Sequence, residues 1–350
     1  MFSISTRASS SPAYVSRRIG AFTPLSRLSS VAASNTRYKV LSLSPVNTTK
    51  MTAAGKTNPH SYTTLQPEGV AVPRPSASLV LLDAQNRILL THRTSTIGSF
   101  ANAHVFPGGN QDPSDPSAAF CAIRETFEET GVLLTTTPPP PSLIPEFPRI
   151  RRDIHDRSHS LSFSQFLDEN GLVADVEGLI PFTTWITPPT MKKRYETRMF
   201  LAFLPLSSSS VDTDTHHHQE QVPTSDGGLE TLSTTFLPAS TILSNLKSNS
   251  IILFPPQAYL ITRLSEFTND SSIGVEEQRD RIKKWVLEGE EKVGEYVFEP
   301  RPEGKTKDGK RLVLGYGPRG DKRRKSVLKF GKGGMPADLE IVEVGEVAKL

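Results

Sequence analysis

The chain has 350 residues, a formal net charge of +3 and a single cysteine, Cys121. This length allows one large domain or two small ones, and no apolar run is long enough to span a bilayer. One cysteine excludes an internal disulfide framework and a cysteine-rich zinc site. Residues 1–50 contain seven basic residues and no acidic residue, so the remainder carries a net charge of −4. A mildly acidic body argues against a general nucleic-acid binder.

Both ends of the chain carry residues typical of targeting signals. Residues 1–50 are rich in Ser and Arg, which is typical of a mitochondrial transit peptide; a plain disordered tail is the alternative. Residues 51–74 are a predicted linker, and initiation at Met51 would remove the basic segment. The last three residues, Ala-Lys-Leu, resemble the Ser-Lys-Leu peroxisomal signal. We therefore expect a peroxisomal or mitochondrial location, or both, with the corresponding import receptors as partners.

Apolar runs predict the strands of a globular domain that begins near Ser76. The segments SASLVLLD and RILLTHR, joined by a short polar turn, predict a β-hairpin. Two further strands around a basic turn are predicted between Leu179 and Leu206. A helix ending near Leu264 and a charged helix after Val275, followed by strand-like segments, predict that ordered structure continues beyond these strands.

The most informative stretch is Phe106–Leu134. If it forms a helix, Glu125, Glu128 and Glu129 share one face within a single turn. Three carboxylates this close repel one another unless a cation lies among them. A hard divalent ion with oxygen ligands, Mg²⁺ or Mn²⁺, is the natural partner, and a solvated acidic helix face is the alternative.

The same helix has an apolar face and recognisable ends. Phe120, Ile123 and Phe127 fall together on the side opposite the glutamates, which predicts packing against a core. Asp115 is predicted to cap the first N–H groups of the helix, and Gly131 to follow its last turn.

Residues Arg124–Val132 carry a family resemblance. Except at Thr126, they match the second half of the Nudix box, G-x5-E-x7-R-E-U-x-E-E-x-G-U, in which U is apolar. The first half departs from the pattern, because Asn110 and Pro116 fall where the box has its glycine and first glutamate. One residue is inserted after Gly109. Two acids are candidates to hold Arg124 in place of the missing glutamate, namely Asp112 and Asp115.

The segments AHVFPGG and CAIRETFEETGVLL are similar to the peroxisomal coenzyme A diphosphatase branch of this superfamily, Nudix type 19. The resemblance implies an α+β fold, an α/β/α sandwich with a mixed β-sheet between helices. We place the Nudix domain at residues 75–270, with disordered insertions near 135–160 and 207–228. A C-terminal helix and β extension are expected at residues 271–350.

The resemblance also implies an activity, that of a metal-dependent hydrolase acting on a diphosphate. The expected substrate is coenzyme A or acyl-CoA, cut to 3′,5′-ADP and phosphopantetheine or its acyl form, with Mg²⁺ or Mn²⁺ as cofactor. One alternative is a Nudix diphosphatase for NADH, ADP-ribose or another nucleotide. Another is a non-catalytic Nudix-fold component of a mitochondrial complex. The expected partner is a small nucleotide-type molecule, with no nucleic acid and no membrane span.

Individual residues receive roles from the same resemblance. The expected catalytic group consists of Arg124, which orients the glutamates, and of Glu125, Glu128 and Glu129. The expected metal ligands are Glu125, Glu128, Glu129 and the carbonyl of Gly109. The expected substrate contacts are Arg93, Arg194 and Arg198, for which a surface arginine or a solvated turn is the alternative. An additional acid near the metal is Glu230, with Glu220 behind it.

Two charged clusters have simpler interpretations. The basic block 322–325 lacks an aromatic stacking platform, so a solvated turn is favoured over a nucleic-acid contact. Residues 216–218, three adjacent histidines in a low-complexity loop, are not expected to form a metal site.

Overall fold

The structure is a computed structural model that describes residues 70–95, 101–156, 161–206 and 222–350. The predicted targeting segment 1–50 lies outside the described residues, as do Glu220 and residues 216–218. All described residues belong to one compact unit. None of the described helices is long and apolar enough to cross a bilayer.

A mixed β-sheet forms the centre of the fold. Its strand order is β3-β2-β1-β6-β5-β8, with β4 paired to β1 and β7 paired to β2. The pairs β1–β6 and β5–β8 are parallel, and the other pairs are antiparallel. The strands are β1 Arg74–Leu82, β2 Ile88–Arg93, β3 His104–Val105, β4 Gly108–Asn110, β5 Ile180–Ile186, β6 Tyr195–Phe203, β7 Thr231–Leu237 and β8 Val297–Phe298.

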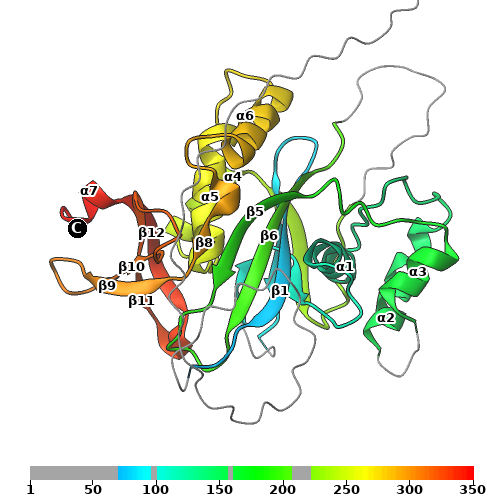
Figure 1. Ribbon diagram of the computed structural model, residues 1–350, viewed down its shortest axis with the longest axis horizontal. Coiled ribbons are helices and arrows are strands. Elements are labelled where there is room, and N and C mark those ends of the chain that lie inside the picture. Colours follow the sequence, from blue (N-terminus) through cyan, green and yellow to red (C-terminus); the bar gives the residue numbers. More distant parts are fainter. Residues whose placement is uncertain (1–69, 96–100, 157–160, 207–221) are drawn as a thin grey trace, which may run out of the picture. The chain divides into compact units, whose positions relative to one another are not determined.

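Helices cover both faces of this sheet, as the α/β/α sandwich predicted (Figure 1). On one face lie α1 Ala118–Thr130, α2 Phe147–His155 and α3 Phe163–Glu169. On the other face lie α4 Ala239–Lys247, α5 Pro255–Thr268 and α6 Val275–Leu287. Single-turn elements complete the helices: η1 Ile144–Glu146, η2 Val293–Glu295, η3 Lys332–Gly334 and α7 Val344–Val347.

Strand β1 contacts both helical layers, which explains its continuous apolar sequence. Leu79 and Leu81 face α1, whereas Val80 and Leu82 face α5 and α6. The predicted hairpin is confirmed: Leu82 pairs with Ile88 across the β1–β2 turn.

A second, four-stranded sheet follows α6 and has the order β12-β11-β10-β9. Tyr316, Leu328 and Leu339 from this region join the same buried cluster as Val80 and Tyr259. The predicted C-terminal extension therefore shares the core of the Nudix-like part. Its strands are β9 Arg301–Lys305, β10 Leu312–Gly315, β11 Arg324–Phe330 and β12 Pro336–Glu343.

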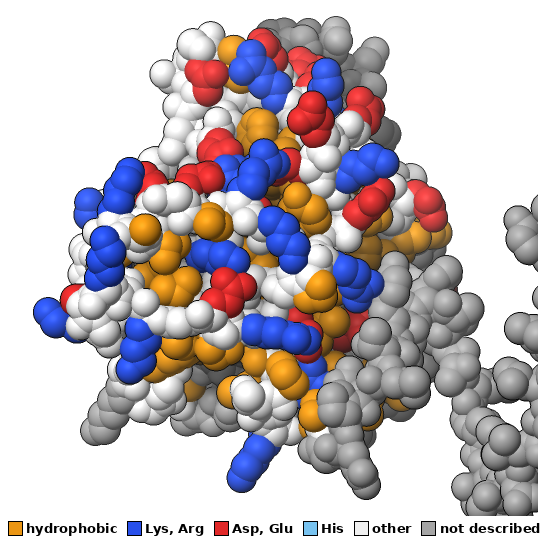
Figure 2. Space-filling model, turned by 60° about the vertical axis from the view of Figure 1, so that its left-hand side comes forward, with side chains coloured by type: hydrophobic (Ala, Val, Ile, Leu, Met, Phe, Trp, Pro, Cys, Tyr) orange, Lys and Arg blue, Asp and Glu red, His pale blue; other side chains and the backbone are white. Residues whose placement is uncertain are grey.

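The basic block 322–325 lies at the start of β11 in this second sheet. On the face of the molecule shown in Figure 2, basic, acidic and apolar side chains are interspersed. Arg323 pairs with Glu291, and Lys325 lies 2.8 Å from Glu303. Arg324 forms ion pairs with three acids: Glu266, Asp321 and Glu343. The block is therefore largely neutralised by neighbouring carboxylates.

The expected disorder near residues 135–160 is wrong for 144–155, which form η1 and α2. Pro145 and Pro148 occupy first-turn positions of these helices, where proline is well tolerated because its missing N–H has no helical partner. Phe147 and Ile150 are buried against α1. Pro145 and Pro148 therefore lie at the starts of helices within a segment where we expected disorder.

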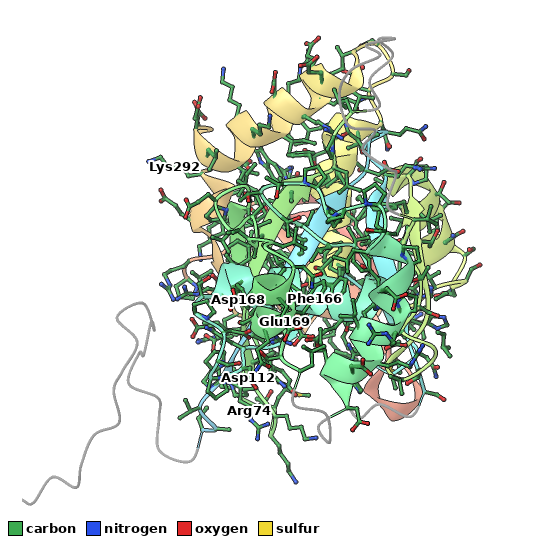
Figure 3. The ribbon with its side chains drawn as sticks, turned by 90° about the vertical axis from the view of Figure 1, so that its right-hand side faces the viewer. Arg74, Asp112, Phe166, Asp168, Glu169 and Lys292 are labelled. Atoms are coloured by element: carbon green, nitrogen blue, oxygen red, sulfur yellow. The ribbon has the colours of Figure 1, made fainter. Side chains whose placement is uncertain are left out.

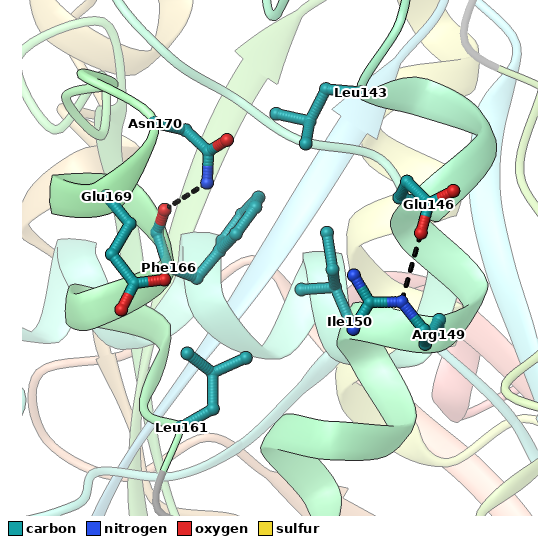
Figure 4. Close-up of a pocket in the computed structure, with 8 residues that line it drawn as sticks. All are labelled: Leu143, Glu146, Arg149, Ile150, Leu161, Phe166, Glu169 and Asn170. Atoms are coloured by element: carbon teal, nitrogen blue, oxygen red, sulfur yellow. Dashed lines mark hydrogen bonds and ion pairs between the residues drawn. The ribbon is translucent and has the colours of Figure 1, made fainter.

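Ile150 also lines a small pocket of about 290 Å³ between α2 and α3 (Figure 4). Its walls are apolar at Leu143, Ile150 and Phe166, and its rim carries Arg149, which is paired with Glu146.

The predicted N-cap of α1 also needs correction. Ser117, rather than Asp115, accepts the Phe120 N–H at 3.1 Å, and Asp115 is used elsewhere. Gly131 ends the helix with φ = 75°, as predicted. The apolar face is also confirmed, because Phe120, Ile123 and Phe127 are buried.

Phe127 provides a test of this core, because its ring packs against Phe147, Phe163 and Phe166. Replacing it with Ala leaves a cavity and should lower the free energy of unfolding by about 3–5 kcal/mol. The exposed Phe330 is the matched control, and Phe330→Ala should change stability by less than about 0.5 kcal/mol. Urea unfolding measures both variants, and equal losses would contradict the packing described.

Candidate active site

The acidic face of α1 lies over β4, and Gly109 makes the close approach possible. A Cβ atom at Gly109 would lie 2.5 Å from the carboxylate of Glu125. At Gly108, a Cβ atom would lie 2.4 Å from the Ala77 carbonyl oxygen on β1. A side chain at Gly108 would collide with the β1 backbone, and a side chain at Gly109 would displace the Glu125 carboxylate from its position over β4.

Arg124 is held on this face by Asp115. Its Nε and Nη2 donate to the two Asp115 oxygens at 2.9 and 2.8 Å, and Nη2 also donates to the Asn110 carbonyl at 3.0 Å. This bidentate pair is strong and fixes the plane of the guanidinium. Of the two acids considered for this task, Asp115 performs it, which is why it does not cap the helix.

The remaining nitrogen of Arg124 contacts two glutamates. Nη1 lies 2.9 Å from Glu125 Oε1 and 3.2 Å from Glu128 Oε2. The helix therefore presents these carboxylates around one oriented cation. This geometry agrees with the expected orienting role of Arg124.

Glu129 is the most buried of the three glutamates, with 3% of its surface exposed. One oxygen accepts the Gly108 N–H at 3.3 Å, and the other lies 3.3 Å from Arg93 Nη1. Arg93 Nη2 in turn lies 3.4 Å from Glu230. The structure thus brings Arg93, Glu129 and Glu230 together, although they come from three distant parts of the sequence.

Glu230 is presented by a loop that sequence analysis did not identify. The Asp226 carboxylate accepts hydrogen bonds from four backbone N–H groups, those of Gly228, Leu229, Glu230 and Thr231. The Glu230 nitrogen lies 2.8 Å from Asp226 Oδ2. The Asp-Gly-Gly sequence was the available signal, because aspartate commonly accepts hydrogen bonds from nearby backbone groups in turns.

Burial raises the pKa values of all three glutamates, and repulsion from other glutamates adds to it at Glu125 and Glu129. For Glu125, burial and the neighbouring Glu128 outweigh the attraction of Arg124 and raise its pKa to about 7. Burial also raises the pKa of Glu128. At Glu129, burial and repulsion from Glu125 and Glu230 hold the pKa well above its ordinary range. The site therefore favours a cation among these carboxylates.

The donor set has the chemistry of a Mg²⁺ or Mn²⁺ site. Carboxylate oxygens dominate it, and the Gly109 carbonyl faces the same helix, 4.0 Å from the Cys121 sulfur. Within the described ranges, no three acid, His or Cys side chains already converge on one point. Arg93 and Arg124 instead pair with the glutamates that a divalent ion would draw together.

Two of the predicted substrate arginines have different surroundings. Arg194 does not face a substrate site: its side chain is fully buried and donates to the Thr187 and Ala71 carbonyls and to Glu299. Its predicted role is therefore wrong, because the guanidinium ties the β5–β6 connection to the C-terminal region. Arg198 is half-buried on β6.

The register of the strands places Arg198 on the face covered by α1. Ala77 pairs with Gly109 on one side and with Arg198 on the other, two strand spacings or about 10 Å apart. Ala77 and Phe200 belong to the core under α1, and side chains alternate along each strand. Arg198 therefore shares a face with Glu125.

Comparison with known proteins identifies similar Nudix hydrolases. Residues 113–264 match the family described as the NUDT19 Nudix domain. Nudix hydrolase 7 of Caenorhabditis elegans is 27% identical over 55% of this chain and 61% of its own. The acyl-coenzyme A diphosphatase NUDT19 of Gallus gallus is 29% identical over 47% of this chain and 44% of its own. The chain thus spans less than two thirds of these curated relatives.

Among solved structures, a NUDIX hydrolase from Alicyclobacillus acidocaldarius matches with a TM-score of 0.43 and 23% identity, over 55% of this chain and 90% of its own. Residues 113–264 are thus similar to Nudix hydrolases, and the family model that matches them is that of the NUDT19 Nudix domain.

The raised pKa of Glu125 makes stability depend on pH. Because the folded state holds this proton up to about pH 7, it binds more protons than the unfolded state between about pH 5 and 7. The free energy of unfolding of the metal-free protein should therefore fall as pH rises through this range. Replacing Glu125 with Gln should reduce that fall by on the order of 1–2 kcal/mol.

Urea unfolding in EDTA at several pH values measures this effect. Glu346 is exposed on α7, so Glu346→Gln is the matched control and should leave the pH dependence unchanged. An unaltered pH slope in Glu125→Gln would contradict the electrostatic description of the site.

Proposed function

We propose that the protein is a divalent-metal-dependent Nudix diphosphatase that hydrolyses the diphosphate of coenzyme A or acyl-CoA. The products are 3′,5′-ADP and phosphopantetheine or its acyl form. One observation carries the proposal: Glu125, Glu128 and Glu129 crowd one helix face over the Gly108–Gly109 strand, with raised pKa values. The similar chicken protein is named an acyl-coenzyme A diphosphatase, which supports the choice of substrate.

In this proposal the residues of α1 have separate tasks. Glu128 and Glu129, with the Gly109 carbonyl, would hold the ion, which would supply positive charge that offsets the charge of the diphosphate. Arg124 keeps the carboxylates oriented through its bond to Asp115. Glu125 would either share in holding the ion or accept a proton from the attacking water.

Basic side chains at one end of the sheet suit the remaining phosphate of the substrate. Arg198 lies on the site face, and the exposed Lys192 and Lys193 occupy the β5–β6 turn. Arg74 lies at the same end, near Asp112 (Figure 3). We propose that Arg198 and these lysines receive the 3′-phosphate of coenzyme A. The peroxisomal or mitochondrial location remains a prediction.

A hydrolysis panel tests the proposed function. CoA, acyl-CoA, NADH and ADP-ribose are incubated with and without Mg²⁺, and product masses are measured. We expect Mg²⁺-dependent release of 3′,5′-ADP from CoA and acyl-CoA. Glu129→Gln should lower kcat about 100-fold or more, because it removes charge from a buried ligand.

Glu177 is an exposed glutamate and supplies the control, so Glu177→Gln should have wild-type turnover. If the protein cleaves ADP-ribose or NADH but neither CoA nor acyl-CoA, the proposed substrate is wrong and the proposed diphosphate hydrolysis still holds. Near-wild-type turnover in Glu129→Gln would overturn the proposed scheme itself.

Arg198 gives a prediction about substrate choice. Loss of one charge-assisted hydrogen bond to the 3′-phosphate should lower kcat/KM for CoA about 10-fold in Arg198→Gln. Dephospho-CoA lacks that phosphate, so its kcat/KM should change by less than about 3-fold. Lys284→Gln, at an exposed position on α6, serves as the control. Equal losses for both substrates would show that Arg198 does not read the 3′-phosphate.

A further inference from the structure

Arg151 is a buried cation to which the proposed reaction assigns no role. It belongs to α2, and only 4% of its surface is exposed, whereas the next residue, Arg152, is exposed. Burial lowers the pKa of Arg151, which reflects the unfavourable transfer of its charge out of water. A guanidinium in this position requires hydrogen-bond partners that offset the loss of solvent.

Those partners belong to two different segments of the site. Nε donates to the Glu128 carbonyl at 2.9 Å, in the last turn of α1. Nη1 donates to Thr224 Oγ1 at 2.9 Å and to the Ser225 carbonyl at 3.4 Å. A cation at a helix C-terminus is favoured by the helix dipole and by the free carbonyl groups there. Arg151 therefore joins the end of the glutamate helix to the loop that follows residue 222.

This loop leads directly to Glu230. Thr224 donates its N–H to the Thr130 carbonyl at 2.8 Å, so the start of the loop is fixed on α1. Asp226 then accepts the Glu230 N–H at 2.8 Å, which fixes the end of the loop. Thr231 Oγ1 also lies 3.4 Å from the Glu129 carbonyl. The segment between Thr224 and Glu230 is thus one hydrogen-bonded unit, with Arg151 at one end and the acid at the other.

Gly131 shows how closely these parts fit together. A Cβ atom there would lie 3.1 Å from Arg151 Nη1 and 3.2 Å from Thr224 Oγ1, and the residue has φ = 75°. The glycine that ends α1 therefore also leaves room for the guanidinium.

We propose that Arg151 is a positioning residue that clamps the 224–230 loop onto the C-terminus of α1 and thereby sets Glu230 against Arg93 and Glu129. This inference rests on the proposed function and on the expectation, stated from the sequence, that Glu230 is an additional acid near the metal. It adds a residue from the helical insertion to the machinery, although that residue touches neither substrate nor metal.

A double-mutant cycle tests the coupling. Arg151→Gln should lower kcat/KM about 10-fold, and Glu230→Gln should do the same or more. If Arg151 acts through Glu230, the double variant should lie within about 2-fold of Glu230→Gln alone. Arg151→Lys keeps the positive charge but loses the planar guanidinium with its several N–H donors, so its decrease in kcat/KM should be intermediate. Arg152→Gln, the exposed neighbour on the same helix, should behave as wild type.

Hydrogen exchange supplies a readout that does not need turnover. The Glu230 and Thr231 amides donate to Asp226, and they should exchange faster in Arg151→Gln than in wild type or Arg152→Gln. The inference would be overturned if the decrease in kcat/KM of the double variant equalled the product of the two single decreases. It would also be overturned if hydrogen exchange at these amides were unchanged. If wild type hydrolyses nothing, the proposed function fails and exchange alone decides whether the clamp exists.

Should Arg151→Gln fail to fold, Thr224→Val replaces it in both experiments. Thr224 is exposed, so losing its hydroxyl opens no buried cavity but removes the strongest contact of Arg151 with the loop. The same two results, non-additivity with Glu230→Gln and faster exchange, are expected.

Discussion

The burial of three neighbouring carboxylates is the constraint on which the site of this structure depends. Glu125, Glu128 and Glu129 lie within one helical turn, and their raised pKa values show that burial and proximity disfavour full ionisation. Two arginines, Arg93 and Arg124, offset part of this charge. The remaining demand for positive charge makes the face suitable for a divalent ion and, through it, for a diphosphate.

The arginines of the fold illustrate how one residue type performs separate tasks. Arg124 and Arg93 contact the carboxylates of the site directly, and Arg151 approaches the same helix from its C-terminal end. Arg194, in contrast, is buried at the end of the β5–β6 connection and donates a hydrogen bond to Glu299. Sequence alone gives each of these side chains the same charge and reach. Their roles follow from which backbone carbonyls and acids surround them in three dimensions.

Much of the fold was predictable, because it depends on local patterns. The apolar face of α1 and the β1–β2 hairpin follow from periodicity, and the glutamate cluster from spacing within one turn. Asp115 illustrates the limit: its place before the helix predicted a cap, but its bond to Arg124 depends on how the loop after Gly109 folds. Arg151 was missed because it lies in the segment near 135–160 where we expected disorder. Its spacing after Phe147, on the buried side of a helix, was the available signal.

The position of β1 has a practical consequence for the boundaries of this domain. The region that sequence comparison recognises, residues 113–264, excludes β1, β2 and the glycine strand beneath Glu125. It also excludes Leu328 and Leu339, which complete the core on the opposite face. A fragment cut at the recognisable limits would lack the central strand of its own sheet. A segment that keeps the residues of both buried clusters is therefore much longer than the recognisable one and extends from β1 through β12.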